Sequence, residues 1–177
     1  RNRVFLQGLP YTYFARFFKS PSGLLVCHHS VTRPWQVFCA PLKGTHFDAE
    51  GNLHLTWWPG NEAMKNKPVE LTPPPARMAS PVAMLGGELD ASYGFVLEGT
   101  LQLPKPLGAP RGLYVEYARN AGMAVLFDHT GRAEFGRVRP DGTGFTAERR
   151  VDREMRFGST GRFRLIVKGP LLEVYLN

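Results

Sequence analysis

The chain has 177 residues and an ordinary globular composition, 43% hydrophobic and 21% charged, so it is long enough to bury a core in one domain or slightly more. No run approaches the roughly 18 apolar residues that span a bilayer, which argues against a membrane partner. The net charge of +7 is spread over the chain, and the basic run Arg149–Arg156 is interleaved with acids, so we expect a solvated face and no nucleic-acid binding.

The two ends carry no targeting signal. The segment Arg1–Phe5 lacks an initiator Met and the apolar core of a signal peptide, and Asn177 ends the chain inside a strand-like run. We therefore expect both termini to be cuts, and the cellular compartment stays unknown.

Short apolar runs separated by turn signals fill residues 1–70. The predicted strands are Tyr11–Phe18, Leu24–His28, Gln36–Ala40 and Leu53–Trp58. This pattern predicts a four-stranded meander. The residues expected to expose apolar surface on it are Phe14, Phe17, Phe18, Leu24 and Val26.

Cys27 and Cys39 lie on the second and third of these strands. They are nearly symmetric about Arg33-Pro34, so a hairpin turning there places them opposite each other and allows a disulfide. Two reduced thiols on neighbouring strands are the other interpretation, and the sequence leaves both open.

Three successive prolines, Pro73–Pro75, mark the clearest boundary, because proline donates no hydrogen bond to a sheet and favours an extended connector. We place the domain boundary there, with residues 1–75 on one side and residues 76–177 on the other. Beyond it, apolar and polar residues alternate in five runs: Phe95–Leu103, Leu113–Tyr117, Met123–Phe127, Phe163–Val167 and Leu172–Leu176. Short strands at this spacing predict an antiparallel β-sandwich or a barrel.

The polar residues form no recognisable catalytic or metal-binding motif. His28 and His29 are adjacent in a strand and so point to opposite faces, which argues against a shared metal ion. Asp48 and Glu50 flank a turn, where acidic side chains make local hydrogen bonds, so we expect turn formation rather than acid/base catalysis. Nucleophile-elbow, phosphate-loop and dinucleotide motifs are absent from the sequence, and no cofactor is expected.

Trp35, Trp57 and Trp58 are the candidates for carbohydrate binding, because sugar rings stack on flat aromatic faces. Trp57 and Trp58 point to opposite sides of a strand, so at most one of them belongs to a given face. Core packing or a domain interface is the competing interpretation for each of the three.

The stretches Ala40–Lys43, Phe47–Leu53 and Lys67–Leu71 follow one another in the first part of the chain, and Phe163–Asn177 forms a terminal hairpin pattern. The first three resemble the last propeller blade and exit segment of glycoside hydrolase family 32, the invertase, inulinase and levanase group. The hairpin resembles that of the family's C-terminal sandwich. The resemblance implies an all-β fold in which a partial β-propeller blade precedes a concanavalin-like antiparallel β-sandwich.

The chain departs from that family in two respects. Family members commonly place an Asp and a Ser before the Glu of the terminal hairpin, where this chain has Lys168 and Pro170 or Leu171. The family's aspartate nucleophile, Arg-Asp-Pro stabiliser and Glu-Cys acid/base have no match, and by the resemblance they would lie upstream of Arg1. No catalytic residue is carried over to this chain.

The leading hypothesis is a non-catalytic C-terminal portion of a family 32-like enzyme that hydrolyses O-glycosidic bonds, with the sandwich stabilising the propeller or shaping substrate access. Its partners would be the missing upstream blades and, through the parent enzyme, a carbohydrate substrate. The alternative is a carbohydrate-binding sandwich that acts without hydrolysis, and a third hypothesis is an independent enzyme with an unrecognised site.

Overall fold

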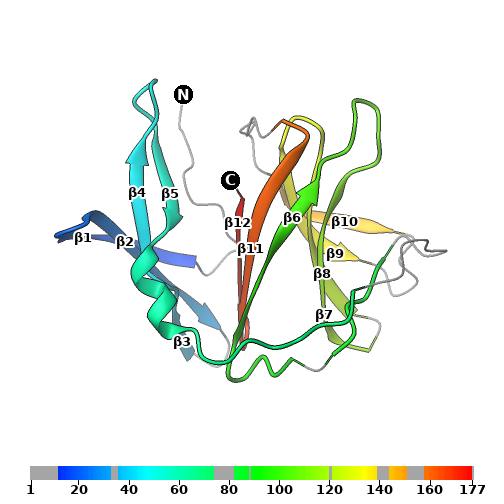
Figure 1. Cartoon of the computed structure of the whole chain (residues 1–177), viewed down its shortest axis with the longest axis horizontal. Coiled ribbons are helices and arrows are strands. Elements are labelled where there is room, and N and C mark those ends of the chain that lie inside the picture. The colour runs from blue at the N-terminus through cyan, green and yellow to red at the C-terminus, as the bar shows by residue number, and fades with distance from the viewer. Residues whose placement is uncertain are drawn as a thin grey trace. The chain divides into compact units, whose positions relative to one another are not determined.

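The computed structural model describes residues 12–32, 36–73, 82–87, 89–119, 121–138, 144–150 and 158–176. Across these ranges the chain is all-β, with three antiparallel sheets and one short 3-10 helix (Figure 1). The all-β class expected from the sequence is confirmed.

The first sheet has five strands, drawn from blue to teal in Figure 1. They are β1 (Thr12–Ser20), β2 (Gly23–Thr32), β3 (Gln36–Cys39), β4 (Lys43–Phe47) and β5 (Leu53–Trp57). The order is β1-β2-β4-β5, and β3 also pairs with β2. The helix η1 (Pro59–Met64) follows directly after β5 and Trp58.

The expected four-stranded meander is therefore wrong by one strand, because β4 was not predicted. Strands β3 and β4 pair with successive parts of β2, β3 with its C-terminal part and β4 with Leu25 and Val26. Pro41 stands between β3 and β4, and it cannot donate a backbone hydrogen bond to β2. Pro41 thus separates the segment that pairs with β2 into the two short strands β3 and β4.

The second sheet contains β7 (Arg111–Ala118), β8 (Ala121–Phe127), β9 (Ala133–Val138) and β10 (Phe145–Arg150), in the order β10-β9-β8-β7. The third contains β6 (Phe95–Gln102), β11 (Thr160–Lys168) and β12 (Leu171–Leu176), in the order β12-β11-β6. In Figure 1 the orange strand β11 lies beside the green strand β6. The five alternating runs of the sequence correspond to β6, β7, β8, β11 and β12, whereas β9 and β10 were not predicted.

The chain forms two compact units that do not follow chain order. The first comprises Arg1–Lys67, Ala91–Leu97 and Leu165–Tyr175, and the second comprises Pro68–Asp90, Glu98–Arg164 and Leu176–Asn177. The predicted boundary after residue 75 stays a prediction, since residues 74–81 lie outside the described ranges.

Each unit has its own apolar core. Among the described residues, the buried hydrophobic side chains of the first unit are Leu25, Val26, Ala40, Leu165, Ile166, Val167 and Leu171. Those described in the second unit are Leu103, Ala124, Val125, Phe127 and Ala133. Of the apolar residues expected at the surface, Phe17 and Phe18 are exposed at 49% and 47%, but Val26 is 0% exposed and the expectation for it is wrong. Leu24 is half-buried, and the side chain of Phe14 is not described.

Candidate functional site

Three polar side chains are buried in the described part of the first unit. They are His28 of β2, Lys43 of β4 and Asn61 of η1, which are 4%, 2% and 2% exposed. A buried ammonium group is costly unless a counter-charge and hydrogen bonds accompany it. The partners of Lys43 therefore identify the most constrained polar site of this unit.

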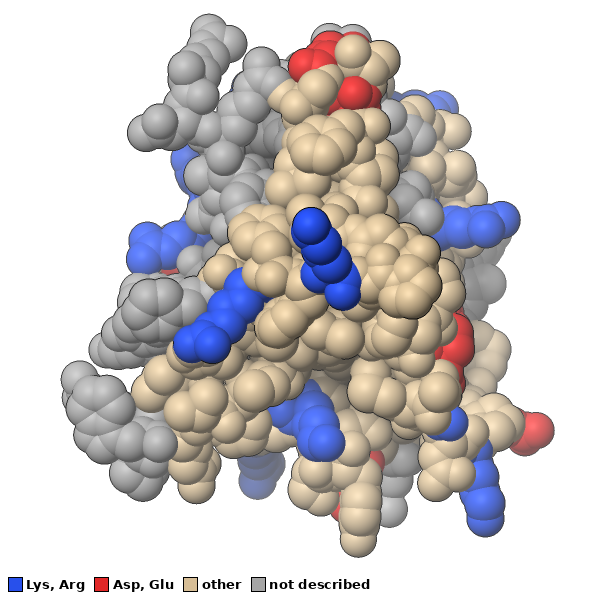
Figure 2. Space-filling view, turned by 90° about the vertical axis from the view of Figure 1, so that its left-hand side faces the viewer, with Lys and Arg blue, Asp and Glu red and all other residues tan. Residues whose placement is uncertain are grey.

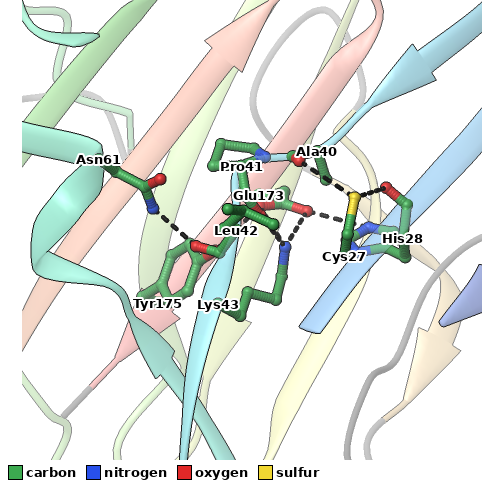
Figure 3. Close-up of polar contacts among 9 residues, drawn as sticks. All are labelled: Cys27, His28, Ala40, Pro41, Leu42, Lys43, Asn61, Glu173 and Tyr175. Carbon is green, nitrogen blue, oxygen red and sulfur yellow. Dashed lines mark hydrogen bonds and ion pairs between the residues drawn. The ribbon is translucent and has the colours of Figure 1, made fainter. Parts of the chain in front are cut away.

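Glu173 of β12 provides the counter-charge (Figure 3). Lys43 Nζ lies 3.0 Å from Glu173 Oε1 and 3.1 Å from Oε2, and it donates to Pro41 O at 3.1 Å. His28 Nε2 lies 3.0 Å from Glu173 Oε1. The three ammonium protons of Lys43 thus match three acceptors.

Tyr175 completes what we call the buried cluster, which consists of His28, Lys43, Glu173 and Tyr175. Its hydroxyl donates to Glu173 Oε2 at 3.1 Å, because residues two apart in a strand share a face. Lys43 Nζ also lies 5.7 Å from the centroid of the Tyr175 ring, within range of a cation–π contact. Each carboxylate oxygen of Glu173 therefore accepts two hydrogen bonds.

The neighbouring residues hold the cluster in place. Asn61 Nδ2 donates to Leu42 O at 2.7 Å, and this bond anchors the backbone just before Lys43. The Trp57 ring meets the Tyr175 ring edge-on, with centroids 5.7 Å apart and planes at 87°. These contacts restrict the two side chains that touch Glu173 from β4 and β12.

The charges of the cluster balance. Burial by itself raises the pKa of Glu173, but the hydrogen bond from His28 and the charge of Lys43 outweigh it, and the pKa is lowered. Burial lowers the pKa of Lys43, and the adjacent carboxylate opposes this change. The Nε2 atom of His28 donates to Glu173. The other ring nitrogen, Nδ1, is buried and has no hydrogen-bond partner among the described residues.

This geometry is that of a structural ion pair. A general acid or base must come within hydrogen-bond reach of a substrate atom. The Glu173 side chain is 10% exposed and its acceptor positions are occupied by protein donors. The cluster thus fastens β12 to β2 and β4, and it joins Lys43 to a residue 130 positions away.

Sequence reasoning did not find this cluster. It treated His28 only as an unsuitable metal ligand and Glu173 only as part of a hairpin. One signal was present: Glu173 is the single charged residue in the otherwise apolar run Leu171–Leu176. A lone carboxylate on the core side of such a strand requires a buried partner.

Asp48 makes the turn contacts expected of it. Its carboxylate accepts hydrogen bonds of 2.7 Å from the backbone of Asn52 and from the Asn52 side chain, and it lies 2.7 Å from His54 Nε2. The hydrogen bond with His54 holds the pKa of Asp48 well below its ordinary value. Asp128 repeats the arrangement before β9, accepting from the backbones of Thr130 and Arg132. In both turns a glycine with positive φ follows three residues after the Asp.

The tryptophan candidates occupy different surroundings. Trp57 ends β5 and donates to Glu62 Oε1 at 2.6 Å, whereas Trp58 lies between β5 and η1 and donates to Ser22 Oγ at 3.2 Å. Both side chains are half-buried. Trp35 lies outside the described residues. Sugar binding by these tryptophans stays a prediction.

The two cysteines are free thiols. Cys39 pairs directly with His29, so Cys27 lies diagonal to Cys39 on the same face of the sheet. Diagonal positions are about 7–8 Å apart at the Cα atoms, which is beyond ordinary disulfide reach. Burial raises the pKa of the Cys27 thiol, and the thiol of Cys39 acts in the same direction.

In the part of the chain that the structure describes, no three His, Cys, Asp or Glu side chains are grouped so that they could hold a metal ion. No helix among these residues has the length and apolar character needed to cross a bilayer.

Comparison with protein-family models, with curated proteins and with solved structures finds no match for this chain.

Proposed function

We propose that this chain is the non-catalytic C-terminal portion of an enzyme related to glycoside hydrolase family 32. In this proposal the five-stranded sheet belongs to the last blade of a propeller. The other sheets belong to a concanavalin-like sandwich that stabilises the propeller or shapes access of the carbohydrate substrate. The proposal rests on the resemblance of the sequence and on the role of the buried cluster.

The observation that carries the non-catalytic role is the state of Glu173. It lies in the terminal hairpin that resembles the family's sandwich, and its carboxylate is occupied by Lys43, His28 and Tyr175. Asp48 and Asp128 are likewise engaged by turn residues. Two-carboxylate glycoside hydrolysis needs one carboxyl group at the glycosidic oxygen and another at the anomeric carbon or its water. These three carboxylates are committed to the fold instead.

The direct experiment has two arms. The purified chain is incubated with sucrose, inulin, levan and aryl glycosides, and we expect no product above the buffer control. The sequence upstream of Arg1 in the source gene is then read and expressed together with this chain, and we expect hydrolysis of one of these substrates to appear. Hydrolysis by the chain alone, or an upstream region without an Asp nucleophile and a Glu acid/base, would contradict the proposal.

The alternative, a carbohydrate-binding sandwich, is favoured by one observation. The aromatic side chains of Tyr93 and Tyr117 are 84% and 63% exposed, and exposed rings are the surfaces on which sugars stack. Affinity electrophoresis in gels that contain inulin or levan tests it. Retardation that is lost in Tyr93→Ala or Tyr117→Ala would favour the binding module over the structural role.

A further inference from the structure

Cys27 and Cys39 lie on the same face of neighbouring strands of the first sheet. Cys39 of β3 pairs with His29 of β2, and Cys27 stands two residues before His29, so the three side chains point to one side. Cys39 is exposed and Cys27 is half-buried. Redox-sensing cysteines are solvent-accessible and commonly lie next to a second, resolving cysteine. The two thiols have this arrangement.

The sulfur of Cys27 is directed toward the end of β3. Cys27 Sγ lies 3.9 Å from the carbonyl oxygen of Ala40, the residue that follows Cys39 (Figure 3). Burial raises the pKa of the Cys27 thiol most, and the nearby Cys39 raises it further. Both observations place the Cys27 thiol close to Cys39.

The distance that still separates the two thiols from a bond is small. Diagonal positions of an antiparallel pair lie about 7–8 Å apart at the Cα atoms, and disulfides usually join Cα atoms up to about 6.8 Å apart. A shift of β3 by roughly 1 Å therefore brings the sulfurs within reach. Strand β3 has four residues, three of them exposed, and Pro41 follows shortly after it. Few contacts oppose such a shift of so short and exposed a strand.

An imidazole lies beside the exposed thiol. Ala40 N donates to His28 O at 3.0 Å, which makes His29 and Cys39 a pair of the non-hydrogen-bonded kind. In such pairs the Cα atoms are about 4.5 Å apart and the side chains are in close contact. The His29 ring is therefore placed to take the proton of the Cys39 thiol when its sulfur reacts.

The charges near the two thiols are mainly positive. Arg16 of β1 pairs with Cys27 on the other side of β2, and residues 12–47 contain no Asp or Glu. Figure 2 views the side where the first sheet lies in Figure 1, and it shows acidic residues mainly toward the margins of a largely uncharged surface with a few Lys and Arg side chains. Neighbouring cations favour the thiolate, which is the reactive form of cysteine.

We propose that Cys27 and Cys39 form a redox switch that a peroxide closes and a thiol reductant opens. In the first step the Cys39 sulfur attacks one peroxide oxygen, the O–O bond breaks, and His29 passes the thiol proton to the leaving oxygen. Cys39 becomes a sulfenic acid, and the peroxide is reduced to water or an alcohol. In the second step the Cys27 thiol displaces the hydroxyl group, which gives the disulfide and water.

The disulfide clamps β3 onto β2. Because β3 must move to form it, the bond is strained, and strained disulfides are readily reduced. Two molecules of glutathione restore both thiols and leave as glutathione disulfide. The inference is independent of the proposed function, since it concerns thiols that the buried cluster does not use.

The test treats the full, fully reduced chain with hydrogen peroxide in slight molar excess and follows its intact mass. We expect the mass to fall by that of two hydrogen atoms, and a digest made without reduction to contain one peptide pair joined through Cys27 and Cys39. Millimolar glutathione should return the original mass. In Cys27→Ser the sulfenic acid at Cys39 has no partner in the chain, so dimedone should trap it there.

The same sheet offers a matched control for the imidazole. His29→Gln should slow formation of the disulfide by about tenfold or more, because it removes the proton acceptor beside Cys39. His46 is an exposed histidine of β4 that pairs with His54, and His46→Gln should change the rate by less than about twofold. Far-ultraviolet circular dichroism of each variant checks that it remains folded.

Several results would overturn the inference. A sulfinic acid at Cys39 while Cys27 stays a thiol, or dimers joined through Cys39, would show that the two thiols do not pair within one chain. A disulfide that resists millimolar glutathione would be a structural bond rather than a switch. Equal rates in His29→Gln and His46→Gln would remove the role given to His29.

Discussion

Removing one partner of the buried cluster should destabilise the first unit far more than removing both. In Glu173→Ala the Lys43 ammonium, whose side chain is 3% exposed, loses two of its three hydrogen bonds and its counter-charge. Leaving one charge of a buried pair unpartnered costs about 3–5 kcal/mol. That is a large share of the roughly 5–15 kcal/mol by which domains are stable.

The double variant Lys43→Met/Glu173→Leu removes both charges and keeps apolar volume in the site. Such replacements are often neutral, or stabilising by about 1–4 kcal/mol. Together with the single variants Lys43→Met and Glu173→Leu it closes a double-mutant cycle, in which we expect a coupling free energy of about 3 kcal/mol or more between the two positions. The matched surface pair is Arg137–Glu148, in which Arg137 is 69% exposed, and Glu148→Ala should cost about 1 kcal/mol or less.

Urea denaturation followed by tryptophan fluorescence is the suitable assay, because all three tryptophans belong to the first unit. Slopes of the transitions must be compared together with midpoints, so that changes in stability are separated from changes in exposed surface. If Glu173→Ala costs less than about 1 kcal/mol, or if the coupling falls within about 0.5 kcal/mol of zero, the buried cluster does not fasten β12 as argued.

The remaining predictions concern pH, packing and the thiols. The pKa of Glu173 is lowered in the folded state from its ordinary 4.5, so the stabilisation by its carboxylate is present above that value and is lost as the pH falls through the folded pKa. The urea midpoint of the unmodified chain should therefore fall with acid more steeply than that of Lys43→Met/Glu173→Leu. Equal pH dependence of the two midpoints would contradict this. Gly112→Ala should destabilise the second unit by about 1–3 kcal/mol or more, because a Cβ there would overlap the Val125 carbonyl oxygen. Gly161→Ala should cost less, because its Cβ would meet only the flexible side chain of Leu176. Calorimetry of both variants compares the two losses of stability. Both cysteines should react with a thiol reagent without prior reduction, Cys39 quickly and Cys27 slowly, because burial raises the pKa of Cys27. If neither cysteine of the native chain reacts until the protein has been reduced, the two form a disulfide.

Local patterns of the sequence were sufficient for part of this structure. Period-two alternation identified β6, β7, β8, β11 and β12, since a strand with one buried face must alternate wherever it lies. The contacts of Asp48 in its turn were equally predictable, because its hydrogen-bond partners Asn52 and His54 lie within six residues of it. The opposite directions of His28 and His29 followed from the same periodicity, and His28 does lie on the buried side with Glu173.

Only the tertiary structure decided the rest. Strand β4, with the sequence Lys-Gly-Thr-His-Phe, lacks apolar alternation, and its first residue is a buried lysine whose counter-charge lies 130 residues away in β12. Strands β9 and β10 are rich in charge and are joined across the sheet by the pairs Arg137–Glu148 and Arg150–Glu134, which no single segment reveals. A lone charged residue in an apolar strand indicates that a partner must exist, because burial penalises every arrangement that leaves the charge unpaired. Which residue is that partner depends on how distant segments of the chain pack together.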